Sequence, residues 1–329
     1  MRLQEIYHPI RGELKEVERV LEASLEDTKN KSILKVSRFL RESSGKRIRP
    51  ALVILSAKAN SSHALAENKK ALIEIASAIE LIHIASLIHD DVIDHSALRH
   101  NKPTVNSRWG QDVSIALGDY LYSLAFKLIS SCPNNDILAC ISSATKAMCE
   151  GELTQVVERD NLSLLQERYI MIIKKKTASL FAASCQAGAI LSNSPRPLQN
   201  ALKQYGLNFG IAFQVIDDYL DLVAGKKSLG KLPGQDIAVG EMTLPLLNLL
   251  KSVSKEKRGR IYSLLKSRNK ECLKKIKIEL IQSTARQESR RIIFSYMDSA
   301  KEKLKLLADT EYRDSLSALG DFILKRGFS

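Results

Sequence analysis

Two short acidic motifs contain the residues of this chain that are best suited to chemistry. Each motif reads D-D-x-x-D and follows an apolar run, and together they contribute six aspartates: Asp90, Asp91, Asp94, Asp217, Asp218 and Asp221. The first and last carboxylates of each motif are four residues apart, so they share one face of a helix. One such match is weak evidence, but two matches on predicted apolar helices rarely arise by chance.

The surroundings of these aspartates indicate a metal site. Burying several carboxylates without partners costs several kcal/mol each, and hard divalent cations relieve that cost. A ligand set made of oxygen atoms, without clustered His or Cys, favours Mg²⁺, which commonly bridges carboxylates to substrate phosphates. The alternative is two exposed helix ends, which fits the second motif poorly because Phe213, Ile216 and Tyr219 surround it.

Positively charged and polar residues accompany both motifs. Singly, each is typical of a protein surface, but as a set they predict a site for one or two diphosphates: Lys46, Arg47, Arg49, Arg99, Lys174, Lys175, Lys176, Thr177 and Lys231. Lys46 and Arg49 lie just ahead of the apolar PALVIL stretch, where a helix start would favour anions. His83 lies two turns before Asp90 on the same helix face, and Gln214 lies one turn before the second motif.

The elements that must hold these residues are helices. Gly and Pro together number 23, and no alternating strand pattern of useful length occurs. Helical spacing predicts helices at about 14–25, 71–93, 112–131, 136–158, 163–192, 198–223, 242–251, 257–266, 270–282, 284–307 and 311–326. We therefore expect an all-α fold, with residues 1–329 forming a single domain of ten or more helices around a central cavity.

Composition narrows the class of protein. The chain has 329 residues, 44% of them hydrophobic, and five scattered cysteines that suit reduced core thiols. The charged stretch after Met1 does not resemble a signal peptide, and the longest uncharged run is too polar to span a bilayer, so we expect a cytoplasmic protein. Residues 251–277 carry a net charge of +9, which indicates either an anionic partner surface or a solvated basic face.

The order and spacing of eight motifs resemble those of the trans-type polyprenyl diphosphate synthases of the isoprenoid synthase fold. The motifs are GKRIRP, ELIHIASLIHDDVID, LRHNKPTVN, GELTQ, KKTASLF, GIAFQVIDDYLD, GKLPGQD and TLP, which run from Gly45 to Pro245. The resemblance implies that an allylic diphosphate ionises, that the double bond of isopentenyl diphosphate attacks the cation, and that a proton is then lost. It also implies several Mg²⁺ ions, a homodimer and no nucleic-acid partner, and a peripheral membrane contact is a further hypothesis.

The resemblance implies a role for each matching residue. The six aspartates would hold the metal ions, and Arg99, Lys176 and Lys231 would bind the allylic diphosphate. Lys46, Arg49 and His83 would bind isopentenyl diphosphate, with Thr177 and Gln214 at the reacting end. Small residues at Ala85 and Ser86 would leave the tunnel open for a product of about six or more isoprene units, with Leu124, Leu128 or the region near Met148 as a deeper floor.

Three positions depart from the family pattern. His100 replaces a second arginine, Asn101 replaces a glycine, and Glu241 replaces a common lysine. Two cations near the phosphates are thus weakened or lost, so we expect weaker binding of isopentenyl diphosphate. Two alternative classes stay open: a terpene cyclase or head-to-head synthase, and a regulatory subunit of a heteromeric prenyl synthase. A nucleic-acid-binding role for residues 251–277 would show as salt-dependent DNA affinity.

Overall fold

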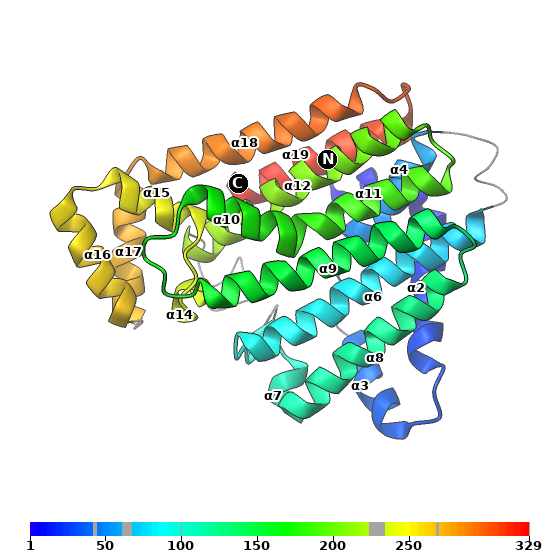
Figure 1. The fold of residues 1–329 in the computed structure, drawn as a ribbon, viewed down its shortest axis with the longest axis horizontal. Helices are drawn as coiled ribbons and strands as arrows, with labels where there is room; N and C mark the ends of the chain where they lie inside the picture. The colour runs from blue at the N-terminus through cyan, green and yellow to red at the C-terminus, as the bar shows by residue number, and fades with distance from the viewer. Residues whose placement is uncertain (42–44, 61–67, 100, 224–233, 268–269, 329) are drawn as a thin grey trace. The chain divides into compact units, whose positions relative to one another are not determined.

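The computed structural model describes residues 1–41, 45–60, 68–99, 101–223, 234–267 and 270–328. Within this described part the fold is all-α, with well over ten helices and one hairpin of two-residue strands, as the sequence predicts (Figure 1). The chain forms two compact units, and each is described by itself. That residues 1–329 form a single domain around a central cavity stays a prediction.

The first unit comprises residues 1–145, 180–206 and 303–319. Its elements are α1 (Leu3–Ile6), η1 (His8–Ile10), α2 (Arg11–Glu26), α3 (Lys31–Arg41), α4 (Ile48–Lys58), α6 (Lys69–Ile93), β1 (Leu98–Arg99), β2 (Lys102–Pro103), α7 (Val105–Trp109), α8 (Gln111–Ser130), the start of α9 (Asn135–Val157), α11 (Ser179–Leu191), the start of α12 (Arg196–Val223), the end of α18 (Ala285–Leu304) and much of α19 (Glu311–Phe328).

Helix α6 is the centre of the first unit. It is apolar nearly all round, and its residues from Ile75 to Ile82 are all buried. Helices α2, α4 and α8 pack against it, and α8 lies alongside it for much of its length (Figure 1). A helix that is hydrophobic on every face needs such a surround, so the sequence pattern already required its central position.

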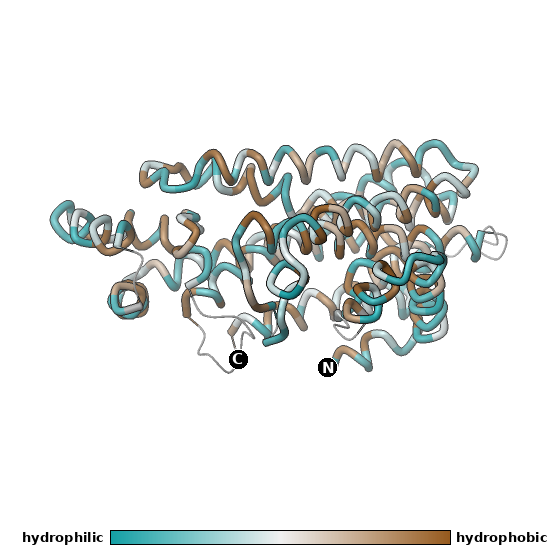
Figure 2. Tube along the Cα trace, turned by 90° about the horizontal axis from the view of Figure 1, so that it is seen from below, coloured by the Kyte–Doolittle hydropathy of each residue, from teal (hydrophilic) through white to brown (hydrophobic). Residues whose placement is uncertain are grey.

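The second unit comprises residues 146–179, 207–302 and 320–329. Besides the ends of α9, α12 and α19 and most of α18, it contains α10 (Gln166–Ile173), a π-helical turn at Lys174–Ala178, α14 (Gln235–Ala238), α15 (Leu244–Ser252), α16 (Lys255–Ser267) and α17 (Lys270–Gln282). A separate hydrophobic cluster, which includes Leu249, Ile261 and Ile276, joins α15, α16 and α17. Hydropathy alternates along the helices, as expected for amphipathic packing (Figure 2).

Most predicted helices begin and end within a few residues of the observed ones. The predicted helix at 163–192 is interrupted by the π-helical turn, and α3 and the short hairpin were not predicted. Among the helices of the described residues, α6 and α8 are long and apolar enough to cross a membrane, although the sequence predicted no such helix. The most apolar window of α6 is 67% buried, which identifies a core helix, whereas that of α8 is only 39% buried.

Candidate functional site

The first acidic motif lies at the carboxyl end of α6. Asp90 and Asp91 are in its last turn, and Asp94 is the C-cap, with the Asp94 amide donating to the Asp90 carbonyl at 2.8 Å. The motif therefore keeps the helical spacing that the sequence predicts. The carboxyl end of a helix carries partial negative charge, and the last turn of α6 contains no basic residue. Three carboxylates at such an end need cations from elsewhere.

Arg99 supplies one of these cations. It lies on β1, and its Nε and Nη2 atoms both lie 2.9 Å from Oδ1 of the buried Asp91. The hairpin turn includes Asn101, whose φ of 61° is in the left-handed region. Asn tolerates this region better than most residues, so its replacement of the family glycine is structurally compatible. His100 lies outside the described residues.

The residues expected to bind the second diphosphate gather at the start of α4. Lys46 is exposed just before the helix, and Arg49 is buried in its first turn with its guanidinium 4.2 Å from the centre of the Phe181 ring. Burial lowers the pKa of His83 well below its usual value, and the charges of Arg49 and Arg99 lower it further. The structure therefore brings His83, Arg49 and Arg99 into one electrostatic environment, with His83 neutral.

Arg47 plays a structural part in the same segment. It is the N-cap of α4 with a φ of 51°, and its guanidinium lies 2.6 Å from Glu18 and 2.9 Å from Glu80. Glu80 is buried on α6, so this ion pair ties the start of α4 to the central helix. Arg47 is thus paired with two carboxylates of the same unit.

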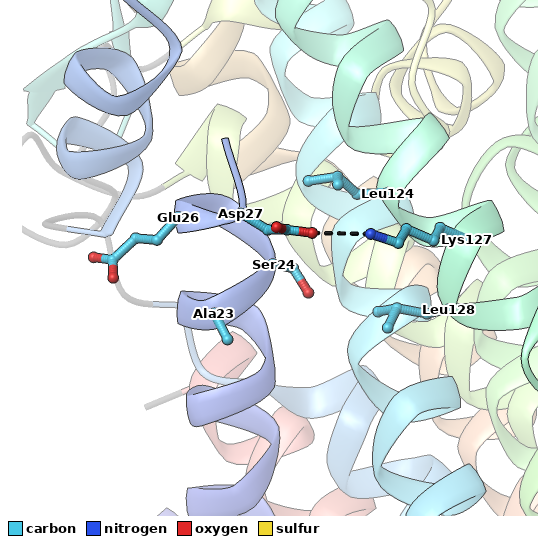
Figure 3. Close-up of a pocket in the computed structure, with 7 residues that line it drawn as sticks. All are labelled: Ala23, Ser24, Glu26, Asp27, Leu124, Lys127 and Leu128. Atoms are coloured by element: carbon cyan, nitrogen blue, oxygen red, sulfur yellow. Dashed lines mark hydrogen bonds and ion pairs between the residues drawn. The ribbon is translucent and has the colours of Figure 1, made fainter. Parts of the chain in front are cut away.

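The face of α6 that is expected to set product length carries Ala85 and Ser86. Ala85 is fully buried, and the Ser86 hydroxyl donates to the His83 carbonyl at 2.8 Å. Leu124 and Leu128 of α8 line a surface hollow that the end of α2 completes (Figure 3). An ion pair between Asp27 and Lys127 spans the two helices there (Figure 3).

The second acidic motif lies in the last two turns of α12. Its middle carboxylate, Asp218, is buried and held by two neutral donors: the Tyr169 hydroxyl at 2.5 Å and the Gln214 amide at 2.7 Å. The Thr177 hydroxyl in turn donates to Gln214 at 2.8 Å. The structure thus brings the predicted Thr177 and Gln214 to Asp218. Tyr169 was missed, although it lies two helical turns before Lys176.

Burial dominates the electrostatics of this motif. It raises the pKa of Asp218 to about 7, against the lowering effect of the hydrogen bonds from Tyr169 and Gln214, and the charges of Asp217 and Asp221 raise it further. Burial and the neighbouring Asp218 also raise the pKa of Tyr169, which keeps its hydroxyl protonated as a donor. A cation beside Asp218 would therefore be strongly favoured.

The third carboxylate of this motif organises the following loop. Asp221 is buried, and one of its carboxylate oxygens accepts from the Asp236 amide at 3.3 Å. Glu241, which departs from the family pattern, lies 3.7 Å from Arg159. The negative charge of Glu241 is thus balanced within the same unit. Lys231 lies outside the described residues.

Lys176 occupies the π-helical turn, a feature that often marks functional sites. Its Nζ lies 2.5 Å from Glu152. A Cβ on Gly151 would lie 2.3 Å from the Lys176 backbone nitrogen, so only glycine permits this close approach of α9. This explains the glycine of the GELTQ motif, in which Glu152 is the next residue.

The side chains of the two motifs are chemically suited to a divalent cation. Within the described residues, no three His, Cys, Asp or Glu side chains converge as a ready-made metal site. The donors are nevertheless carboxylate oxygens, which suit a hard cation. Burial and the charges of Asp217 and Asp221 disfavour the charged form of Asp218, and a cation beside it would offset both effects. Because the motifs belong to different units, their position on either side of one cavity stays a prediction.

With this geometry in place, the comparisons identify the class of protein: the chain belongs to the polyprenyl synthetase family, whose sequence profile matches residues 30–282. It is 36% identical over 315 residues to the short chain isoprenyl diphosphate synthase of Methanothermobacter thermautotrophicus, covering 94% of each chain. It is 33% identical over 312 residues to heptaprenyl diphosphate synthase component 2 of Bacillus subtilis, covering 94% of this chain and 88% of that one.

A solved structure supports the same assignment. The polyprenyl synthase of Caulobacter crescentus, crystallised with calcium and isoprenyl diphosphate, matches with a TM-score of 0.91 and 30% identity over 98% of this chain and 97% of that one. The predicted family, the isoprenoid synthase type of fold and the enzyme class, a prenyltransferase, are thereby confirmed. The relatives' names differ in product length, so they leave the product of this chain open.

Proposed function

We propose that this enzyme condenses an allylic diphosphate with isopentenyl diphosphate in a Mg²⁺-dependent ionisation, condensation and elimination. The aspartates of both motifs would hold the ions, which would neutralise the diphosphate as it leaves. The observation that carries this proposal is the buried Asp218, which the Tyr169 hydroxyl and the Gln214 amide hold in place beside the carboxylates of Asp217 and Asp221.

The side chains of the protein divide the remaining work. Arg99, Lys176 and Lys231 are proposed to bind the allylic diphosphate. Arg99 and Lys176 already face carboxylates, at Asp91 and Glu152, so an arriving diphosphate would share or replace these partners. Fixed cations that meet the negative charge of the leaving group stabilise the transition state more than the ground state.

The second substrate is proposed to bind at the start of α4, through Lys46, Arg49 and His83. Because the pKa of His83 is lowered, its imidazole would act as a neutral hydrogen-bond donor rather than as a charge. Loss of the final proton requires a base, and released diphosphate is our candidate. Buried apolar side chains around Ala85 would keep water from the carbocation.

Product analysis tests the proposal directly. Purified protein would be incubated with Mg²⁺, isopentenyl diphosphate and short allylic primers, with EDTA as the control, and the products separated by chromatography. We expect lengthened prenyl diphosphates that require both substrates. Turnover of the allylic diphosphate alone would identify a cyclase or head-to-head enzyme instead, and activity that appears only with a second synthase chain would identify a regulatory subunit.

We also propose a long-chain product and a homodimer. The proposed dimer would form through α8, because Ile115 and Phe126 are both exposed there and lie on one face about three turns apart. Phe126→Lys should shift the sedimentation of the protein from dimer to monomer. Leu306→Lys, at an exposed leucine outside α8, is the matched control and should leave it a dimer. A monomeric wild-type chain would contradict this proposal.

A cytoplasmic location with peripheral membrane contact completes the proposal. The exposed face of α17 combines Lys274 and Lys275 with Ile278 and Ile281, which are 53% and 46% exposed. Such a face suits an anionic bilayer, and the proposed product is itself lipid-like. Sedimentation with anionic vesicles, but not with zwitterionic ones, is expected. Ile278→Ser should weaken it, and preferential binding to DNA would favour a nucleic-acid role.

A further inference from the structure

The C-terminal end of α19 is joined to the second acidic motif by an ion pair. Within the second unit, Nη1 of Arg326 lies 2.9 Å from Oδ1 of Asp217, the first carboxylate of that motif. Both side chains are partly accessible, at 29% and 34% exposure. Oδ1 of Asp217 is itself buried and accepts no hydrogen bond, so an ion would approach Asp217 through the accessible part of its side chain.

Three neighbouring contacts hold the end of α19 in a defined position. Phe328 packs 5.6 Å from the Tyr219 ring on α12 and 5.7 Å from the Phe294 ring on α18, where the two phenylalanines are stacked. The Arg290 guanidinium lies 4.8 Å from the centre of the Phe328 ring. Residues 326–328 thus contact α12 and α18 through both charge and aromatic packing.

The residue between the ion pair and the aromatic contact is glycine for a steric reason. A Cβ on Gly327 would lie 3.0 Å from Cγ2 of Ile216, which is tighter than an ordinary contact. Ile216 directly precedes Asp217 on α12. The small residue lets the last turn of α19 approach the acidic motif closely enough for Arg326 to reach it.

The charges within the second acidic motif indicate what this ion pair does. Asp217 and Asp221 both raise the pKa of Asp218, so the three carboxylates repel one another. Asp218 has neutral donors and Asp221 accepts from a backbone amide, whereas Asp217 is paired with a full positive charge. A divalent cation that used Asp217 as a ligand would meet the positive charge of Arg326 at the same carboxylate.

We propose that Arg326 is an internal counter-ion of the second acidic motif and competes with divalent metal for Asp217. When a metal ion binds Asp217, it replaces the Arg326 guanidinium, and the contacts that hold residues 326–328 weaken. The mobility of residues 326–328 therefore depends on whether the motif holds a metal ion. This inference rests on the proposed function only in assuming that the motif binds a divalent cation.

The test measures metal affinity rather than catalysis. Mn²⁺ alone would be titrated into the full-length chain after EDTA treatment and dialysis, with bound ion followed by electron paramagnetic resonance. Arg326→Gln should bind Mn²⁺ at least about threefold more tightly than wild type, because the competing cation is gone. Lys325→Gln, which removes the same charge one residue earlier, should change the affinity much less, and Arg326→Lys should restore most of the wild-type value.

A second readout follows the segment itself. Amide hydrogen exchange of residues 322–328 should become faster in wild type when Mn²⁺ is added, whereas Asp217→Asn should show no metal-dependent change there. An Arg326→Gln affinity equal to or weaker than wild type overturns the proposal, as does unchanged exchange at saturating Mn²⁺. Wild type that shows both metal effects but makes no prenyl product would contradict the proposed function and leave this inference standing.

Discussion

The two D-D-x-x-D motifs have the same sequence spacing but different electrostatic environments. The first ends a helix, and its buried Asp91 is neutralised by Arg99 from a hairpin that follows in sequence. The second lies inside α12, and its buried Asp218 is held by the neutral donors Tyr169 and Gln214. Identical motifs therefore need not share a mechanism of stabilisation: one carboxylate is paired with charge, and the other is solvated by dipoles.

The strongest test of this difference between the two motifs removes the buried carboxylate of each. Asp91→Asn and Asp218→Asn should each lower kcat by roughly 10²-fold or more, because each removes charge that positions the leaving diphosphate. Their effects on stability should differ in sign. Asp91→Asn leaves Arg99 without its carboxylate and should lower the melting temperature, whereas Asp218→Asn relieves a buried charge and should raise it above pH 7 in EDTA. Equal shifts would show that the two environments are equivalent.

A bulky residue near the first motif should change the product. Ala85 is fully buried one turn before Asp90, so Ala85→Phe should stop chain growth several isoprene units early while the reaction continues. Chromatography of the dephosphorylated products measures this. Ser123→Phe, at an exposed position of α8, is the control and should leave the distribution unchanged. An unaltered distribution for Ala85→Phe would show that this face does not line the tunnel.

The donors to Asp218 can be tested one at a time. Tyr169→Phe removes the hydroxyl that donates to Asp218 and should lower kcat about tenfold and raise the pKa of Asp218, since a donor that favours its charged form is lost. Tyr262→Phe removes a hydroxyl that donates instead to the Leu162 carbonyl and should have little effect on kcat. Comparable losses in the two variants would assign Tyr169 a purely structural part.

Stability should depend on pH through Asp218. Its folded pKa of about 7 lies above the ordinary value of 3.8, so its contribution to stability is fully present below pH 3.8 and is lost as pH rises through 7. The loss should be a few kcal/mol at most, on the order of 1.4 kcal/mol per pH unit. Urea unfolding in EDTA at pH 5 and pH 8 measures it. Asp218→Asn should have a smaller drop than wild type, and an equal drop would contradict the assignment.

The smallest expected effect concerns a departure from the family pattern near the first motif. His100→Arg restores a second cation beside Arg99 and should lower the KM for isopentenyl diphosphate a few-fold at pH 8. The wild-type KM should also fall at lower pH, where His100 becomes charged. Steady-state kinetics at two pH values measures both effects. An unchanged or higher KM in the variant would show that His100 does not contact that substrate.

Local sequence patterns were sufficient for much of the site. Apolar runs and four-residue spacing predicted α6 and α12, the helical placement of both acidic motifs and the position of Lys46 and Arg49 at a helix start. These features depend on residues within about two turns of one another, so periodicity reveals them. The family motifs then added the expected role of each residue.

Contacts between residues distant in sequence could not be predicted in this way. Three such contacts join separate elements: the ion pairs of Arg47 with Glu18 and Glu80, the hydrogen bond from Tyr169 to Asp218, and the ion pair between Arg326 and Asp217. No spacing rule indicates which of many charged residues will meet. Sequence by itself determined the helices and the chemistry they carry, whereas tertiary packing decided which charged and polar side chains meet, because those contacts join residues far apart in the chain.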